Sequence, residues 1–170
     1  RGHDLVNNVP VTEIVYIHSK LMIVDDTTVI LGSANINDRS MLGTRDSEFA
    51  VIIKEATKFI TKMDGKEYNA AKFAHSFRVN LFAEHLGVDP KNPILDDPVS
   101  DNLQNFIIKS ANSNTKIYYD LFRCYPDDHF MNYQKLKEAK AEIEKRKEKL
   151  LDLFNEYMDK RNKIQGHIVE

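Results

Sequence analysis

Three short apolar runs in the first third of the chain constrain the fold most strongly. They cover residues 14–24, 28–31 and 48–53, and a turn is predicted at Asp25-Asp26-Thr27. Runs of this length bounded by turn residues are typical of β-strands. Because they are nearly continuous rather than alternating, they predict strands covered on both faces. We therefore expect an α/β fold, arranged as a layered α-β-α sandwich.

Helices and loops are expected to follow this first segment. A short helix is predicted between residues 36 and 42, closed by a glycine. Apolar residues at helical spacing predict a longer helix over residues 67–86, and Ser100 or Asp101 can cap another. Thr115 is expected to cap one more short helix.

The charge and the apolar runs exclude several classes of protein. The 170 residues carry 24 Lys and Arg against 26 Asp and Glu, so a strongly basic nucleic-acid binder is not indicated. The longest apolar run, Phe49–Ile53, is too short for a membrane-spanning helix. The single Cys124 cannot form an internal disulfide and favours a reducing compartment. We expect an intracellular protein, either cytoplasmic or peripheral to a membrane, and a piece of a longer chain because it begins at Arg1.

A polar pattern crosses the first two apolar runs. His18, Lys20 and Asp25 are followed by Gly32-Ser33-Ala34-Asn35, which gives H-x-K-x4-D-x6-G-S-x-N. Six fixed positions would match by chance in roughly a few per million chains of this length. The pattern is therefore a specific signal.

The chemistry of this pattern can be derived from its spacing. His18 and Lys20 are two apart on a predicted strand and share a face, as do Ser33 and Asn35. If the two strands are neighbours, the four side chains meet at one end of the sheet. Imidazole can be a nucleophile or a proton carrier, and the other three groups can donate to an anion. The alternative is a set of polar residues that satisfy one another. The set predicts a phosphoryl site without a metal or other cofactor, since no second cluster has ligand spacing.

The polar pattern resembles the HKD signature of the phospholipase D superfamily. Residues 16–20, 32–43 and 45–48 are similar to the second motif of the eukaryotic enzymes that hydrolyse phosphatidylcholine, and the resemblance extends over residues 11–125. It implies an enzyme with two such motifs related by a pseudo-twofold axis, of which this chain supplies one lobe. The partner would be an upstream half of the same longer chain, which carries the first motif.

The resemblance also implies a reaction. Phosphatidylcholine-type phospholipids at a membrane surface would be hydrolysed to phosphatidic acid and a free headgroup alcohol through a phosphohistidine, or transferred to another alcohol. No nucleic-acid partner is expected. Two alternatives are a homodimeric nuclease-like phosphodiesterase with one motif per chain, and a non-catalytic binding fragment.

Roles for individual residues follow from the resemblance. His18 would be the general acid and base, while Lys20, Ser33 and Asn35 would bind the non-bridging phosphate oxygens. The catalytic set also contains Asp25, which is expected to support its loop. A carboxylate shortly after the signature would orient His18. Glu48 is the preferred candidate for this role, and Asp46 is the alternative.

The organisation expected from these patterns has three parts. Residues 1–54 form the motif-bearing α/β catalytic core, and residues 55–132 form a helical C-terminal part of the catalytic lobe. Residues 133–170 form a charged, amphipathic helical extension, since ten of the thirteen residues 137–149 are charged.

Overall fold

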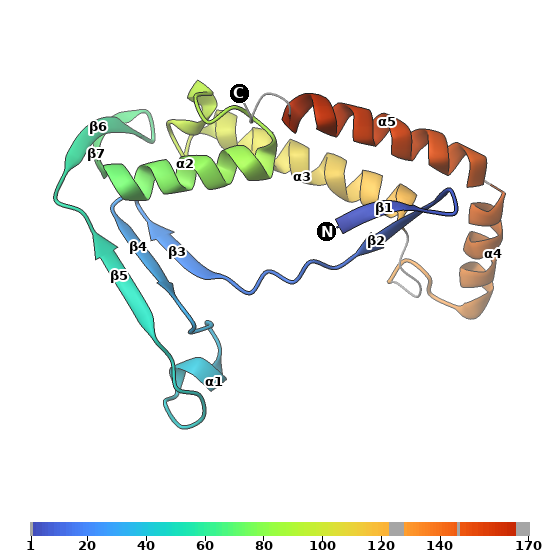
Figure 1. Cartoon of the computed structure of the whole chain (residues 1–170), viewed down its shortest axis with the longest axis horizontal. Helices are drawn as coiled ribbons and strands as arrows, with labels where there is room; N and C mark the ends of the chain where they lie inside the picture. Colours follow the sequence, from blue (N-terminus) through green and yellow to red (C-terminus); the bar gives the residue numbers. More distant parts are fainter. Residues whose placement is uncertain (1, 123–127, 146, 166–170) are drawn as a thin grey trace. The chain divides into compact units, whose positions relative to one another are not determined.

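The computed structural model describes residues 2–122, 128–145 and 147–165, and it divides the chain into two compact units (Figure 1). The central unit is Tyr16–Phe106. The terminal unit combines Arg1–Val15 with Ile107–Glu170. Cys124 and the last five residues of the expected C-terminal extension lie outside the described residues.

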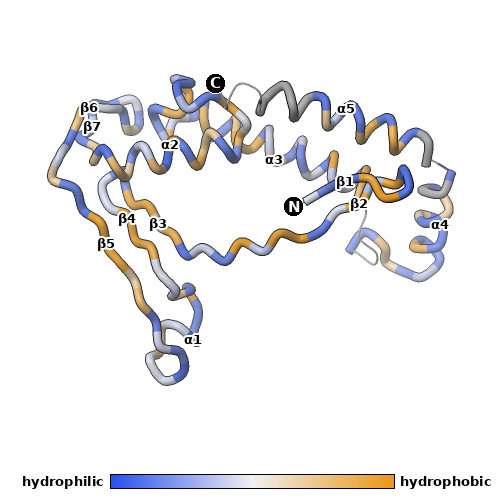
Figure 2. The backbone as a smooth tube through the Cα atoms, viewed as in Figure 1, coloured by the Kyte–Doolittle hydropathy of each residue, from blue (hydrophilic) through white to orange (hydrophobic). Residues whose placement is uncertain are grey.

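A three-stranded antiparallel sheet is the centre of the central unit. Its order is β3 (Lys20–Val24), β4 (Thr28–Gly32) and β5 (Ala50–Lys54). The register pairs Lys20 with Gly32 and Gly32 with Ala50. Figure 2 shows that apolar residues predominate along these strands. The predicted α/β class is confirmed.

Helix α2 (Lys72–Leu86) packs on one face of this sheet. The buried residues between them are Val29, Ala71 and Ala74, and the residues packed around these are Leu21, Ile23, Ile53 and Phe77. On the other face Met22 is 44% exposed and Ile52 is 62% exposed. A second helical layer on that face therefore stays a prediction.

The first predicted strand is shorter than expected. Residues 14–19 have no regular secondary structure, and β3 begins only at Lys20. His18 therefore precedes the strand instead of lying within it. The other two strands match the apolar runs at 28–31 and 48–53 within two residues at each end.

The expected helix at Glu67 begins five residues late because a β-hairpin occupies its start. The hairpin consists of β6 (Lys58–Met63) and β7 (Lys66–Ala71), so the expectation that residues 55–132 contain only helices and loops is wrong here. Its two turn residues, Asp64 and Gly65, have φ values of 55° and 70°. An Asp-Gly pair at positive φ is a strong hairpin signal, and it overrides the helical spacing that follows.

Other predicted elements are present with changed lengths. The short helix α1 (Asp38–Met41) is confirmed, and a 3-10 turn, η1 (Pro93–Leu95), follows α2. Helix α3 (Asp101–Leu121) is capped by Ser100, whose Oγ accepts from the Leu103 N–H at 3.3 Å. The separate helix expected at Thr115 is wrong, because α3 continues through that residue.

The terminal unit contains a hairpin that the sequence patterns did not predict. Strands β1 (Gly2–Val6) and β2 (Val9–Glu13) are joined by Asn7 and Asn8, both at positive φ. The expected C-terminal extension forms two helices, α4 (Tyr133–Glu144) and α5 (Lys147–Gln165). Leu121, Phe122 and Phe154 form the buried centre of this unit. None of the helices in the described ranges is long and apolar enough to cross a membrane.

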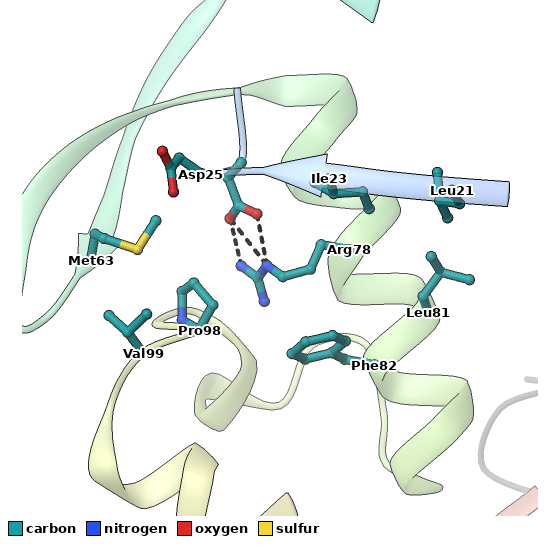
Figure 3. A pocket seen from close by; sticks show the side chains of 10 residues that line it. Leu21, Ile23, Asp25, Met63, Arg78, Leu81, Phe82, Pro98 and Val99 are labelled. Carbon is teal, nitrogen blue, oxygen red and sulfur yellow. Dashed lines mark hydrogen bonds and ion pairs between the residues drawn. The ribbon is translucent and has the colours of Figure 1, made fainter. Parts of the chain in front are cut away.

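A buried ion pair fixes the turn between β3 and β4 to helix α2 (Figure 3). Asp26 and Arg78 are only 3% and 5% exposed. Arg78 Nε and Nη2 donate to the two Asp26 carboxylate oxygens at 2.8 and 2.7 Å, and Nη1 donates to the Leu95 carbonyl at 2.5 Å. His75 Nδ1 lies 2.9 Å from the same carboxylate. Arg78 therefore connects α2 to the β3–β4 turn through Asp26, a residue that the sequence placed only in a turn.

Removing one partner of this pair should destabilise the central unit. Arg78→Ala leaves a buried carboxylate without its counter-charge, which typically costs about 3–5 kcal/mol of unfolding free energy. Urea unfolding followed by circular dichroism measures this loss. The matched control is Arg39→Ala, which breaks the exposed Arg39–Asp46 pair and should change the unfolding free energy far less. Equal losses of unfolding free energy in the two variants would show that the buried pair stabilises the unit no more than the exposed pair does.

The same pair should make stability depend on acid pH. Burial on its own raises the pKa of Asp26, but the hydrogen bonds and charge of Arg78, and then those of His75, hold that pKa below its ordinary value. Because the pKa of Asp26 is lower in the folded than in the unfolded state, its ionised form stabilises the fold at pH values above the ordinary pKa of Asp. This stabilisation is lost as the pH falls below about 4. The unfolding free energy should therefore decrease from pH 5 to pH 3, and Asp26→Asn should flatten that decrease. An unchanged slope in Asp26→Asn would contradict this assignment.

Candidate functional site

The polar residues of the motif line one cavity of about 350 Å³ in the central unit. It lies beyond the ends of β3 and β4 that are opposite to the Asp26 turn. Its lining residues come from the segment before β3, from the loop after β4 and from the segment before β5; they are His18, Lys20, Ser33, Asn35, Asn37, Arg39, Ser40, Asp46 and Glu48. We call it the site cavity.

Asp25 is the one expected site residue that does not line the site cavity. It lies in the turn at the far end of β3, where its carbonyl oxygen accepts from the Tyr68 hydroxyl at 2.9 Å. Five residues of strand separate it from Lys20, which corresponds to roughly 16 Å. Asp25 therefore cannot contact the same anionic group as Lys20, and the supporting role expected for it stays a prediction.

His18 and Lys20 contact each other directly, although His18 precedes the strand. Lys20 Nζ lies 2.9 Å from His18 Nδ1 and donates to the His18 carbonyl at 2.6 Å. Because an ammonium can only donate, Nδ1 is the acceptor, and the hydrogen of the neutral ring is on Nε2. An ammonium has three hydrogens, so in the described part of the chain Lys20 keeps one for a ligand.

Gly32 allows the loop that carries Ser33 to start close to β5. A Cβ at this position would overlap the Phe49 carbonyl oxygen and would lie 2.7 Å from the Ala50 Cα. Because this glycine has no side chain, it permits the close approach of the neighbouring strand, which places Ser33 beside the segment before β5.

Glu48 joins two serines of this loop. Ser33 Oγ donates to Glu48 Oε2 at 2.5 Å, and Ser40 Oγ donates to Glu48 Oε1 at 2.5 Å. These hydrogen bonds, the one from Ser33 first, lower the pKa of Glu48 below its ordinary value, so the group is a carboxylate at neutral pH. The expected bond from Glu48 to His18 is not formed in the described part of the chain: the Glu48 oxygens accept from the two serine hydroxyls, and His18 Nδ1 accepts from Lys20.

The alternative orienting carboxylate, Asp46, is also paired elsewhere. Arg39 Nε and Nη2 donate to its two oxygens at 3.0 and 3.2 Å. The hydrogen bond and charge of Asp46 raise the pKa of Arg39 further above its ordinary value. Among the described residues, the imidazole of His18 is therefore hydrogen-bonded by Lys20 and not by either candidate carboxylate.

Asn35 is held through its backbone, while its carboxamide remains available. Its N–H donates to Ser40 Oγ at 3.1 Å, and its carbonyl accepts from the Asn37 N–H at 2.9 Å. Within the described ranges its side chain makes no hydrogen bond, and the residue is exposed. The Asn35 carboxamide can therefore donate to a ligand in the site cavity.

Ser40 is a residue of the site cavity for which the sequence patterns predict no role. It stands three residues after Asn37, which caps α1 by accepting from the Ser40 N–H at 3.1 Å. An Asn followed three residues later by a Ser at the start of a helix was the available signal. It predicts the cap but not the contact with Glu48, which is eight residues away.

Two further cavities among those of the central unit bear on the site. One of about 380 Å³ is mostly apolar and shares Lys20 and Asn35 with the site cavity. The other, of about 370 Å³, lies beside Arg78, whose guanidinium is already bonded to Asp26 and Leu95 (Figure 3). Residues 2–122, 128–145 and 147–165 contain no cluster of three or more His, Cys, Asp or Glu side chains suited to a metal ion.

Comparison with known proteins finds one family along most of the chain. A family model described as phospholipase D matches residues 8–166. The chain is 46% identical to human phospholipase D1 over 140 residues and 46% identical to bovine phospholipase D2 over 140 residues, in each case over 81% of its length. It is 40% identical to phospholipase D zeta 1 of Arabidopsis thaliana over an alignment of 179 positions, which covers 93% of the chain.

The chain is much shorter than these relatives. The aligned parts cover 13% of human phospholipase D1, 15% of bovine phospholipase D2 and 16% of the Arabidopsis protein. The match of the family model to more than half of the chain, together with the cavity built from the HKD pattern, shows that the chain belongs to the phospholipase D family.

Proposed function

We propose that this chain supplies one half of the active site of a phospholipid phosphodiesterase. The observation that carries the proposal is the gathering of an imidazole, an ammonium and a free carboxamide around one cavity. Lys20 and Asn35 are the donors that would hold the non-bridging oxygens of a phosphodiester. His18 supplies the titratable nitrogen next to them.

His18 would act as general acid and base through Nε2, the ring nitrogen that Lys20 leaves unoccupied. The acid form is the imidazolium, which has a hydrogen on both ring nitrogens, so in that form Lys20 must release Nδ1. In the first step the histidine of an upstream half attacks phosphorus, the bond to the headgroup oxygen breaks, and His18 protonates that oxygen. In the second step His18 takes a proton from water or an alcohol, whose oxygen attacks phosphorus and breaks the P–N bond.

Two observations favour a phospholipid as the substrate. The mostly apolar cavity of about 380 Å³ shares Lys20 and Asn35 with the site cavity, so an apolar arm of a bound phosphodiester would have a surface to contact. The net charge of −2 lacks the basic excess that is typical of nucleic-acid binders. We therefore propose phosphatidylcholine-type lipids at a membrane surface as substrates, cleaved to phosphatidic acid and the headgroup alcohol.

The half-site proposal predicts that the chain alone has little or no activity. Its single HKD pattern provides one of the two histidines that the mechanism needs. Phosphatidylethanol formation from phosphatidylcholine vesicles in the presence of ethanol, measured for the chain alone and together with the upstream half of a relative, checks this. We expect turnover only in the mixture. Robust turnover by the monomeric chain would contradict the two-half mechanism, and turnover by a homodimer would favour the nuclease-like alternative.

The acid and base role predicts an unusual time course for His18→Asn in the active mixture. A p-nitrophenyl phosphodiester needs little protonation of its leaving oxygen, so the first step should survive better than the second. We expect a burst of nitrophenol followed by arrest. His85→Asn, on the exposed side of α2, is the control and should give normal turnover. If His18→Asn abolishes both the burst and the turnover, His18 is the nucleophile instead.

A further inference from the structure

The direction of the hydrogen bonds assigns different roles to Ser33 and Ser40, the two serines between β4 and β5 that bond to Glu48. Glu48 is ionised, so it accepts hydrogen bonds and cannot donate them. Each serine hydroxyl has one hydrogen, and each lies 2.5 Å from a different Glu48 oxygen. The hydrogens of Ser33 and Ser40 are therefore both directed to Glu48.

Ser33 consequently presents an acceptor, not a donor, to the site cavity. Its Oγ already accepts from the Phe49 N–H at 3.0 Å, and the one other acceptor near its hydrogen, the Phe49 carbonyl, is farther away at 3.4 Å. An anionic phosphate oxygen accepts hydrogen bonds, so it cannot bond to the Ser33 hydroxyl, whose hydrogen is already donated to Glu48. This geometry leaves Lys20 and Asn35 as the donors to phosphate and removes Ser33 from the donor set expected from the sequence.

Ser40 is the residue that connects this arrangement to Asn35. Its Oγ donates to Glu48 and accepts from the Asn35 N–H at 3.1 Å, so one hydroxyl joins the carboxylate to the backbone of a phosphate donor. The hydroxyl is part-buried, and its own backbone N–H is fixed by Asn37 at 3.1 Å. The Ser33–Glu48–Ser40 bridge thus closes the loop that carries the Asn35 carboxamide.

We propose that Ser40 is a positioning residue of the phosphate site: through Glu48 it keeps the Ser33 hydroxyl as an acceptor, and through the Asn35 backbone it fixes the carboxamide that donates to phosphate. This inference rests on the proposed function, because it assumes that a phosphoryl group binds in the site cavity. Ser40 itself does not contact the reacting atoms.

The test compares Ser40→Ala with Ser40→Thr in the 170-residue chain. Inorganic phosphate is the probe, and its affinity is measured by calorimetry. Loss of the hydroxyl should weaken phosphate binding roughly three- to tenfold, the range expected for one structural hydrogen bond, while Ser40→Thr should stay close to the unmodified chain. Ser47→Ala, an exposed serine in the same loop that makes no hydrogen bond in the structure, is the matched control and should bind normally.

A second readout separates positioning from a general loss of structure. Carbon-13 NMR of the Glu48 carboxyl carbon follows its titration. Ser40→Ala removes one of the two hydroxyl donors, so the titration midpoint should move upward, while Ser47→Ala should leave it in place. If Ser40→Ala does not fold, Ser40→Cys keeps the size with only a weak donor, and it should show the same two changes to a smaller degree.

The outcomes distinguish this inference from the function on which it rests. The positioning role is supported if Ser40→Ala binds phosphate more weakly and raises the titration midpoint of Glu48, and if Ser40→Thr shows neither change. Normal phosphate binding by a folded Ser40→Ala overturns the positioning role and leaves the proposed function intact. If the unmodified chain binds no phosphate, the proposed phosphate site is contradicted, and the positioning role falls with it.

Discussion

The buried pair of Asp26 and Arg78 is the interaction on which the central unit depends. The three-stranded sheet is small, and only one of its faces is covered by α2, so apolar burial alone gives it limited support. The guanidinium ties the turn of the β3–β4 hairpin to the helix and to the Leu95 carbonyl at the same time. Because both charges are almost fully buried, loss of either partner would leave the other charge without compensation.

The two ends of the β3–β4 hairpin have separate tasks. At the turn, the charge of the buried Asp26 carboxylate is compensated by Arg78. Both groups are used in this pair, so neither is left for a ligand. At the open end, Lys20 and Asn35 retain hydrogen-bond donors, and the chain beyond β4 is shaped by the bridge through Glu48. A rigid hairpin anchored at one end is a suitable support for a polar site at the other, because positioning depends on elements that do not move.

Much of the site could be predicted from sequence, since the motif residues are close in the chain and lie on neighbouring strands. What the spacing could not supply was the partner of each group. The contact between Ser33 and Glu48 spans 15 residues and depends on how β5 meets β4. The late start of α2 has a different, local origin: residues 67–71 have helical spacing, but the neighbouring turn at Asp64 and Gly65 places them in a strand. Local patterns fixed which residues gather, and contacts between distant segments decided their hydrogen bonds.

The central claim is that phosphate binds between Lys20 and Asn35. Titration of the nitrogen-15-labelled chain with inorganic phosphate, followed by amide chemical shifts, tests it most directly. The account predicts that the largest shifts occur at Lys20, Ser33 and Asn35, and that residues around Arg78 change little. Shifts centred on Arg78 and Phe82, in the cavity on the α2 side of the sheet, would contradict the account, as would the absence of any localised change.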